Sequence, residues 1–426
     1  MKLWEKGFST DKKIDIFTVG SDRELDLVIA KYDVLASKAH AKMLHKIGLI
    51  TEDEANLLVK ELTNIGQTIE NGTFNIEDNF EDVHSKIEYL LTEKLGDTGK
   101  RIHTARSRND QVLVAVNLYL KNELEQIKAS TKELFDVLIN LADKYQNTLL
   151  PGYTHLQIAM PSSFGLWFSA YAESLIDDLY FIDAAHKIVD QNPLGSAAGY
   201  GSSFPIDRDF TTAELDFETL KYNVVAAQMS RGKSEKSTAF GLSSIASTLA
   251  KFSMDICLYM SQNFDFITFP NELTTGSSIM PHKKNPDVFE LIRGKCNKIQ
   301  AVPNQLAMLT TNLPSGYHRD LQLTKEIIVP AIQELKSCLE MMVFSIQNII
   351  VKDNILDDKK YDYLFSVDTL NDLVLSGVPF RDAYKQMGEA IENGTFKPKR
   401  NIAHTHKGSL GNLCLEEIKA KMEKLF

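Results

Sequence analysis

Apolar side chains recur at steps of three and four along much of the chain, the spacing that places them on one face of an α-helix. Four such stripes run through residues 127–141, 168–182, 242–256 and 332–349. Strict alternation of apolar and polar residues, which is typical of a half-buried strand, is scarce. The pattern therefore predicts an all-α fold in which long helices pack at shallow angles.

The proline positions also favour long helices, since proline inside a helix removes a hydrogen bond and clashes with the preceding turn. No proline occurs before Pro151, between Pro205 and Pro270, or between Pro330 and Pro379. Polar segments rich in glycine, proline or charge interrupt the helical pattern. These segments cover residues 102–111, 151–157, 274–287 and 313–325.

Residues 276–287 read Gly-Ser-Ser-Ile-Met-Pro-His-Lys-Lys-Asn-Pro-Asp. A loop of this kind can surround a carboxylate with donors from Lys283 and Asn285 while Ser277 presents a hydroxyl. Serine is a poor base unless positive charge and fixed N–H groups lower its pKa. Removal of a proton beside a carboxylate needs both, because negative charge accumulates there in the transition state. A basic, solvated surface turn is the alternative interpretation.

Two further segments contain candidate binding groups. Residues 103–111 read His-Thr-Ala-Arg-Ser-Arg-Asn-Asp-Gln, in which two arginines can hold a carboxylate through forked donors; a charged first turn of a helix is the alternative. Residues 151–157 read Pro-Gly-Tyr-Thr-His-Leu-Gln and place a threonine and a histidine just before an expected helix. His155 is the strongest histidine candidate for an acid or base, and a structural histidine is the alternative.

Composition narrows the class of protein. The 426 residues are 43% hydrophobic, enough for a large core, and the net charge of −10 argues against nucleic acid as the main partner. The four cysteines lack metal-ligand and redox spacing, so reduced, packed thiols are expected. The opening Met-Lys-Leu-Trp-Glu-Lys has no apolar run typical of a secretion signal, and no apolar run approaches the ~18 residues of a membrane span. A cytoplasmic location is therefore expected.

These segments together resemble the fumarase/aspartase superfamily, whose members eliminate fumarate from succinyl-type substrates. The Lys-Lys-Asn-Pro-Asp, Arg-Ser-Arg-Asn-Asp-Gln and Pro-Gly-Tyr-Thr-His-Leu-Gln strings are similar to its argininosuccinate lyase branch, which some lens crystallins (delta-crystallin) also resemble. Two departures stand out. His282 occupies a position where the branch usually has glutamine, and residues 226–236 differ from its S-x-R-D-F stretch.

The resemblance implies roles for individual residues of this chain. Ser277 would be the base, Lys283 and Asn285 would stabilise the aci-carboxylate, and His155 would help protonate the leaving nitrogen. Further substrate contacts would come from residues of the other three polar segments: Ser107, Arg108, Asn109, Thr154, Tyr317, Gln322 and Lys325. Glu290 would hold the loop lysine, whereas His84, beside Asp82, would be positional rather than chemical.

The resemblance also implies an architecture and a reaction. It implies an elongated chain of three domains (residues 1–102, 103–352 and 353–426), with a long central bundle that forms a core of about 20 helices in a homotetramer. Active sites would be shared between subunits and would split argininosuccinate into arginine and fumarate without metal or cofactor. The alternatives are a lyase for another succinylated amine and a non-catalytic, crystallin-like structural protein.

Two other patterns suggest ligand sites but have simpler interpretations. The run Gly195-Ser-Ala-Ala-Gly-Tyr-Gly201 looks like a phosphate-binding loop, but no strand pattern precedes it, so a nucleotide fold is not expected. It better matches the P-L-G-S turn of the superfamily. His404 and His406 suggest a metal site, yet no acidic or sulfur partner lies near them in sequence. A basic, solvated tail from Lys397 to Gly411 is therefore expected.

Overall fold

The computed structural model describes residues 11–400, 402 and 404–426, so the expectations that concern the first ten residues fall outside it. The chain divides into two compact units. One unit comprises Met1–Lys128, Phe181–Ser244 and Lys298–Leu335, and the other comprises Ala129–Tyr180, Ile245–Asn297 and Lys336–Phe426. The division into three domains stays a prediction.

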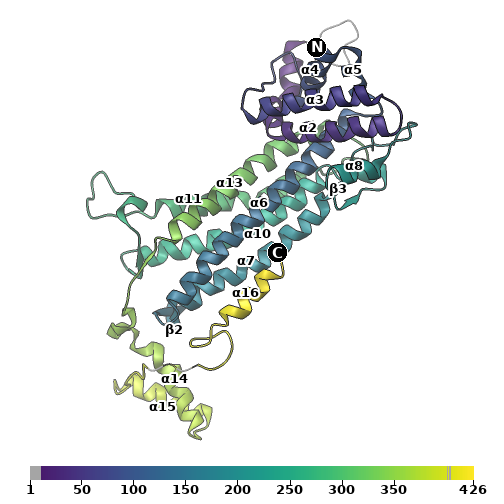
Figure 1. Cartoon of the computed structure of the whole chain (residues 1–426). Helices are drawn as coiled ribbons and strands as arrows, with labels where there is room; N and C mark the ends of the chain where they lie inside the picture. Colours follow the sequence, from purple (N-terminus) through teal and green to yellow (C-terminus); the bar gives the residue numbers. More distant parts are fainter. Residues whose placement is uncertain (1–10, 401, 403) are drawn as a thin grey trace. The chain divides into compact units, whose positions relative to one another are not determined.

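Long helices account for all four apolar stripes, which confirms the helical prediction. They are α6 (Arg108–Lys144), α7 (Phe164–Val189), α10 (Lys233–Met260) and α13 (Thr324–Ile346), labelled in Figure 1. The apolar residues that recur at steps of three and four are buried; in α7, for example, they are Phe168, Tyr171, Leu175, Leu179 and Ile182. The last stripe runs slightly too far, because Ile349 lies beyond the end of α13. Pro330 lies inside α13, so this helix begins before the proline-free stretch.

The first unit contains a layer of helices near the start of the chain. α2 (Asp22–Lys46) packs against α3 (Glu52–Glu70) and α4 (Val83–Leu95), as Figure 1 shows. A capping box begins α3: the Glu54 amide donates to the Thr51 hydroxyl (3.2 Å), and the Thr51 amide donates to the Glu54 carboxylate (2.8 Å).

Shorter elements complete this unit. They are α1 (Lys12–Val19), α5 (Asp97–Lys100), η1 (Arg101–His103), β3 (Gln191–Asn192), α8 (Arg208–Glu214), β4 (Thr219–Leu220), α9 (Val224–Met229), α12 (Val302–Leu309) and η3 (Arg319–Leu323).

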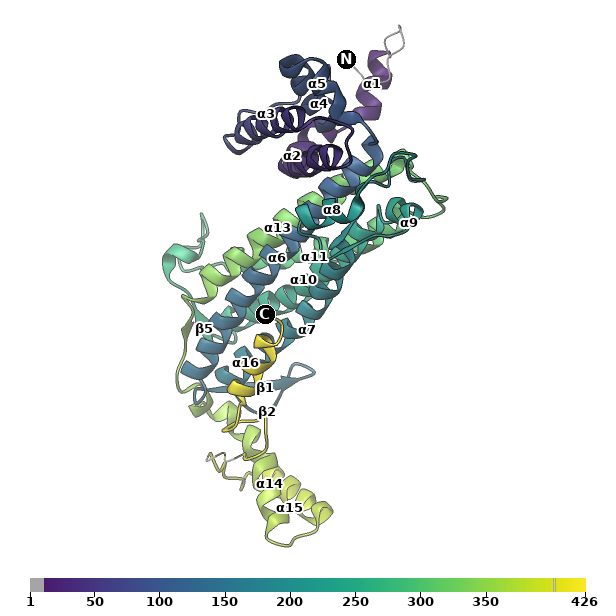
Figure 2. The ribbon, with the colours of Figure 1, turned by 45° about the vertical axis from the view of Figure 1, so that its right-hand side comes forward.

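The second unit has an aromatic core. Trp167 and Tyr171 pack against Phe252, and both donate hydrogen bonds to the Asp255 carboxylate, at 3.1 and 2.6 Å. A smaller apolar cluster joins α14 (Ser366–Leu375) to α15 (Phe380–Glu392), which lie side by side in Figure 2. The other elements are β1 (Leu149–Thr154), β2 (Gln157–Ser163), β5 (Ile267–Thr268), η2 (Asn271–Leu273), α11 (Asp287–Ile299), β6 (Ile350–Val351), η4 (Ile355–Asp357), η5 (Lys359–Phe365) and α16 (Leu415–Glu423).

Small two-stranded sheets add to the helical fold. The antiparallel hairpin β1–β2 covers residues 149–163, so the prediction that His155 lies just before a helix is wrong. A two-residue strand, β3, does precede the glycine-rich run at 195–201, and it pairs in parallel only with β4. The apolar pattern gave no sign of these strands, because β3, β4, β5 and β6 have only two residues each and burial along β1 and β2 does not alternate strictly.

The cysteines form no disulfide bonds among the described residues. The four cysteines are free thiols; Cys296 and Cys338 are buried, while Cys257 and Cys414 are half-buried. Within the described part of the chain, no helix is both long and apolar enough to cross a membrane.

Candidate active site

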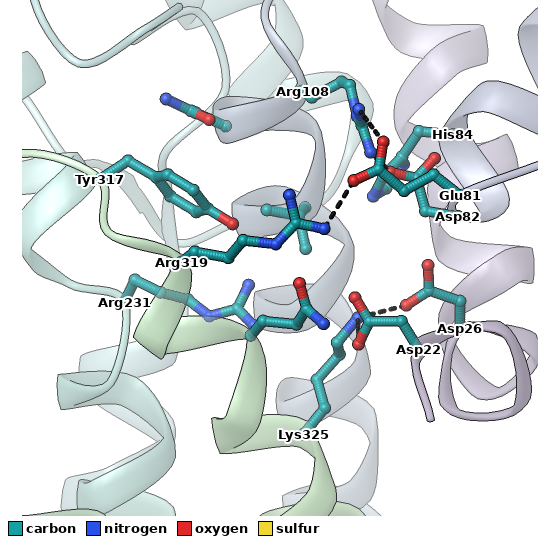
Figure 3. Close-up of a pocket in the computed structure, with 13 residues that line it drawn as sticks. Asp22, Asp26, Glu81, Asp82, His84, Arg108, Arg231, Tyr317, Arg319 and Lys325 are labelled. Atoms are coloured by element: carbon teal, nitrogen blue, oxygen red, sulfur yellow. Dashed lines mark hydrogen bonds and ion pairs between the residues drawn. The ribbon is translucent and has the colours of Figure 1, made fainter. Parts of the chain in front are cut away.

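A pocket of about 200 Å³ in the first unit gathers most of the binding residues that the sequence predicted there. It takes residues from α2, α4, the start of α6 and the η3 region (Figure 3). The predicted residues that line it are His84, Arg108, Asn109, Tyr317, Gln322 and Lys325. Sequence reasoning missed Asp22, Asp26, Glu81, Arg231 and Arg319, which also line it.

Two arginines on one side of this pocket form ion pairs with acidic residues of the chain. Glu81 accepts from Arg319 at 2.6 Å and from Arg108 at 3.2 Å, and Arg108 also pairs with Asp82. Figure 3 shows the two arginines converging on the Glu81 carboxylate. Arg319 further donates to the Thr18 carbonyl at 2.9 Å. Forked guanidinium donors are therefore fixed in position before any ligand is present.

Lys325 forms the opposite side and is almost fully buried, at 3% exposure. Its Nζ lies 2.9 Å from Asp22 Oδ1 and also contacts Asp26. Burial lowers the pKa of Lys325, but the carboxylates of Asp26 and Asp22 outweigh it and hold that pKa above its ordinary value. Gln322 donates its amide to the carbonyls of Thr18 and Val19, at 3.0 and 3.1 Å.

The pocket is balanced in charge. Its lining contains four carboxylates (Asp22, Asp26, Glu81, Asp82) and four cations (Arg108, Arg231, Arg319, Lys325). Such a lining suits a zwitterionic ligand that carries both carboxylates and cationic nitrogen, because each charge of the ligand finds an opposite charge.

Asp110 fixes the start of α6, where Arg108 and Asn109 lie. Its carboxylate is fully buried and accepts from the amides of Ser107 (2.9 Å), Gly195 (3.1 Å) and Ala197 (2.9 Å). The glycine-rich run thus binds a carboxylate of the chain itself. A side chain at Gly195 is excluded, since a Cβ there would lie 2.8 Å from Arg208 and φ is +84°. The Ser107 hydroxyl accepts from the Asn109 amide at 3.3 Å.

His84 lines the pocket and also belongs to a buried group of charged and polar side chains around Asp33. His84 Nδ1 is 3.1 Å from Asp33 Oδ1, and Arg106 Nη2 is 3.4 Å from the same oxygen. Burial alone would raise the pKa of Asp33, but His84 and Arg106 lower it below the ordinary value. These contacts agree with a positional role for His84.

Thr154 and His155 lie in the second unit, at the hairpin of β1 and β2. Thr154 ends β1, and His155 and Leu156 form the two-residue turn, with φ of +54° and +58°. Left-handed backbone at two consecutive non-glycine residues is unusual, and such strain is common at functional sites. The turn exposes His155 to solvent.

The strain of this turn gives a stability prediction. Replacing Leu156, which is 73% exposed, with glycine should raise the free energy of unfolding by about 1 kcal/mol, because glycine adopts positive φ without the cost of a Cβ. Leu156→Ala is the matched control and should not stabilise. Urea unfolding of the three proteins measures the difference, and equal values for glycine and alanine would contradict it.

The loop of residues 276–287 also lies in the second unit and is closed at its base. The Asn285 amide donates to the Thr275 carbonyl at 2.8 Å, and the Asn285 side chain donates to the Gly276 carbonyl at 3.2 Å. Inside the loop, the Ser277 hydroxyl accepts from the amides of Met280 (3.2 Å) and Ile279 (3.4 Å). Fixed N–H groups therefore point at the one oxygen for which an alkoxide is predicted.

Lys283, Asn285 and Glu290 line one open pocket of about 510 Å³ in this unit. Glu290 lies in the first turn of α11, as predicted, and both Lys283 and Glu290 are exposed. His282, the departure from the argininosuccinate lyase branch, lines the same pocket. His155 is not among the described residues that do so.

The tail was predicted incorrectly in part. His404 is not a solvated histidine without an acidic partner: Asp368 Oδ1 lies 2.9 Å from its Nε2, and Ser409 Oγ lies 2.8 Å from its Nδ1. Asp368 is 36 residues away in sequence, so spacing could not reveal it. Within residues 11–400, 402 and 404–426, no group of three or more His, Cys, Asp or Glu side chains is suited to a metal ion.

Comparisons with known proteins identify the family. A family model described as Lyase matches residues 6–301. An argininosuccinate lyase from Parabacteroides distasonis is 57% identical over 424 residues, covering 100% of this chain and 95% of the relative. Among solved structures, an EDDS lyase in complex with formate matches with a TM-score of 0.80 at 19% identity, over 99% of this chain and 90% of its own. A class II fumarase from Schistosoma mansoni matches with a TM-score of 0.76 at 17% identity, over 99% and 96%.

The solved structures show that this mostly helical fold is fumarase-like. The family match and the full-length identity are more specific than the fold. The chain therefore belongs to the lyase family and, within it, to the argininosuccinate lyases.

Proposed function

We propose that the chain cleaves argininosuccinate into L-arginine and fumarate by β-elimination. Ser277 removes a proton from the carbon beside the succinyl carboxylate, and the electron pair of that C–H bond moves into the carboxylate to give an aci-carboxylate. Collapse of this intermediate forms the double bond of fumarate and breaks the C–N bond. The supporting observation is that the amides of Ile279 and Met280 converge on the Ser277 hydroxyl, which favours its charged form.

Lys283 and Asn285 stabilise the charge that develops on the carboxylate. Lys283 is exposed at the mouth of its pocket, and Asn285 is held by Thr275 at the loop base. Glu290 lines the same pocket and orients Lys283. The donors act where charge appears, so they stabilise the transition state more than the bound substrate.

His155 protonates the departing guanidinium nitrogen, directly or through a bound group, and Thr154 contacts the substrate. The balanced pocket of the first unit binds the arginine end. Tyr317, Gln322 and Lys325, which line it, contact the amino-acid group. Arg108 and Asn109, which also line it, hold a carboxylate together with the preceding Ser107. Arg108 and Lys325 already form ion pairs with acidic residues of the chain. Substrate binding therefore replaces these ion pairs with ion pairs to the substrate.

The sites are shared between the subunits of a homotetramer, in which long helices of all subunits form one core. This assembly rests on the resemblance to the superfamily. It agrees with the division of the site residues between the two units, since Arg108 and Lys325 lie in one and His155 and Ser277 lie in the other. A cytoplasmic location also stays a prediction.

The activity is tested by mixing the purified chain with argininosuccinate and following fumarate by its ultraviolet absorbance. We expect release of fumarate and arginine in equal amounts. A parallel panel of other succinylated amines identifies the substrate. Release of fumarate only from another succinylated amine would show that this amine, and not argininosuccinate, is the substrate. If no compound releases fumarate, a crystallin-like structural protein is favoured.

Replacing Lys283 with alanine should lower kcat more than it raises KM. Its charge matters most when the second negative charge develops on the carboxylate, an interaction made only in the transition state. Lys284→Ala, the neighbouring lysine of the same pocket, is the control. A raised KM with unchanged kcat for Lys283→Ala would show that this lysine only holds the substrate.

Activity should survive exhaustive dialysis against a chelator. Lysine, arginine and amide donors provide the positive potential that the elimination needs, and the described residues offer no cluster suited to a metal ion. The measurement is fumarate release before and after dialysis, with metal analysis of the protein. Loss of activity that one divalent ion restores would overturn the metal-free mechanism.

A further inference from the structure

A second pocket in the first unit, of about 380 Å³, has a different electrostatic character. Residues from the 228–236 and 310–321 stretches line it. Its charged lining residues are Arg231, Lys233 and Lys236, and none of the described residues that line it is acidic. The substrate pocket, in contrast, balances four cations with four carboxylates.

The two lysines have no ion-pair partner in the part of the chain that the structure describes. Lys233 is exposed and Lys236 half-buried at the start of α10. The charge of Lys233 also acts on a neighbouring lysine: burial first, and then Lys233, lower the pKa of Lys221. This corner of the protein therefore has excess positive charge that the chain itself does not neutralise.

Arg231 supplies a buried donor, with only 5% of its surface exposed. Its Nε pairs with Glu235 at 2.8 Å, and its Nη2 donates to the Leu321 carbonyl (3.1 Å) and the Thr324 hydroxyl (3.3 Å). Its Nη1 has no hydrogen-bond partner within the described residues. A buried N–H group without an acceptor is costly, so an acceptor from a ligand would be stabilising.

Two more buried atoms of the lining lack partners among the described residues. Gln228 is 1% exposed, and its Oε1 has no donor, whereas its Nε2 donates to Ser196 and Ala197. His318 Nε2 is likewise unpartnered. The pocket thus offers cationic donors together with an amide oxygen that needs a hydrogen-bond donor.

We propose that this pocket binds a small, doubly charged oxyanion that retains one hydroxyl, such as hydrogen phosphate. Its charged oxygens contact Lys233, Lys236 and the free N–H of Arg231, while its hydroxyl donates to Gln228 Oε1. A dicarboxylate ionised at both ends satisfies the lysines but leaves the Gln228 oxygen without a donor. The chemistry of the lining therefore favours the protonated oxyanion.

The site adjoins the substrate pocket through shared residues. Arg231 lines both pockets, and the neighbours Tyr317 and His318 line one pocket each. An anion on Arg231 reduces the positive potential available to a substrate carboxylate, so phosphate raises KM, and by reciprocity substrate weakens phosphate binding. This coupling rests on the proposed function, whereas phosphate binding itself does not.

The test is calorimetric titration of the intact protein with inorganic phosphate at constant ionic strength. We expect saturable binding that Lys233→Gln/Lys236→Gln weakens by about tenfold or more, since two charge-assisted contacts are lost. Lys251→Gln, an exposed lysine on the same helix, should bind as wild type does. Thermal unfolding without phosphate checks that each variant is folded, and Lys233→Arg/Lys236→Arg should retain binding.

Arg108→Gln, in the substrate pocket, decides where the phosphate lies. It should leave phosphate affinity unchanged within about twofold, because Arg108 does not line the second pocket. The proposal is overturned if phosphate binds the lysine double variant as tightly as wild type, if Arg108→Gln alone abolishes binding, or if no saturable binding occurs. Binding without any change in KM would remove the coupling and keep the site.

Discussion

Turnover should fall by a factor of at least ~10²–10⁴ when Ser277 is replaced with alanine, the usual cost of losing a general base. The hydroxyl is small and half-buried, and it accepts two backbone N–H groups that can bind water in its absence. Folding and substrate binding should therefore stay close to wild type. The measurement is kcat for fumarate release, with binding followed by calorimetry.

Ser278→Ala is the matched control, because Ser278 is the next residue, is exposed and has no proposed role. Its kcat should stay within about twofold of wild type. Near-normal fumarate production by Ser277→Ala would remove Ser277 from the role of base, and an equal loss in both variants would indicate damage to the loop.

The second large effect is a gain of activity from two inactive proteins. His155→Ala and Ser277→Ala chains, unfolded together in equal amounts and reassembled, should recover about a quarter of wild-type activity if each site takes these residues from different subunits. The fraction is the chance that the contributed histidine and the contributed serine are both intact. The measurement is fumarate release by the reassembled mixture, compared with that of each variant unfolded and reassembled alone.

A matched pair makes this test specific. Ser277→Ala and Lys283→Ala chains should not restore each other, because both residues belong to one loop and enter a site from the same chain. Pull-down with a tagged subunit establishes that mixed tetramers form. Mixed tetramers as inactive as their parents would contradict the shared site for this protein.

The sequence predicted the long helices well because each one buries a stripe of regular period. The hairpin at Thr154 and His155 was missed for the opposite reason. Its turn places left-handed backbone at His155 and Leu156 and contains no glycine or asparagine, the residues that usually indicate such a two-residue turn.

In the candidate site, the residues that belong to recognisable motifs were predicted, and their partners from distant parts of the chain were not. Arg108, Gln322 and Lys325 lie in strings similar to a known family, so they could be named in advance. Asp22 and Asp26 could not, because they lie on α2 about 300 residues before Lys325 and meet it only through folding. The Arg319–Glu81 pair was hidden in the same way.

Arg231 is instructive because it lies within 226–236, the stretch that departs from the family pattern. Glu235, one helical turn later, pairs with Arg231, so the group remains ordered despite the altered sequence around it. Comparison of this stretch with the family motif therefore did not reveal that its arginine lines the pocket.

The buried carboxylate of Asp110 has a consequence for the entropy of binding. Three backbone amides, one beside Arg108 and two from the glycine-rich run, are immobilised on it when the chain folds. The cost of ordering the backbone that presents Arg108 and Asn109 is thereby met during folding and is absent from the binding step. The buried Asp110 carboxylate thus keeps this backbone rigid before the substrate carboxylate binds to Arg108 and Asn109.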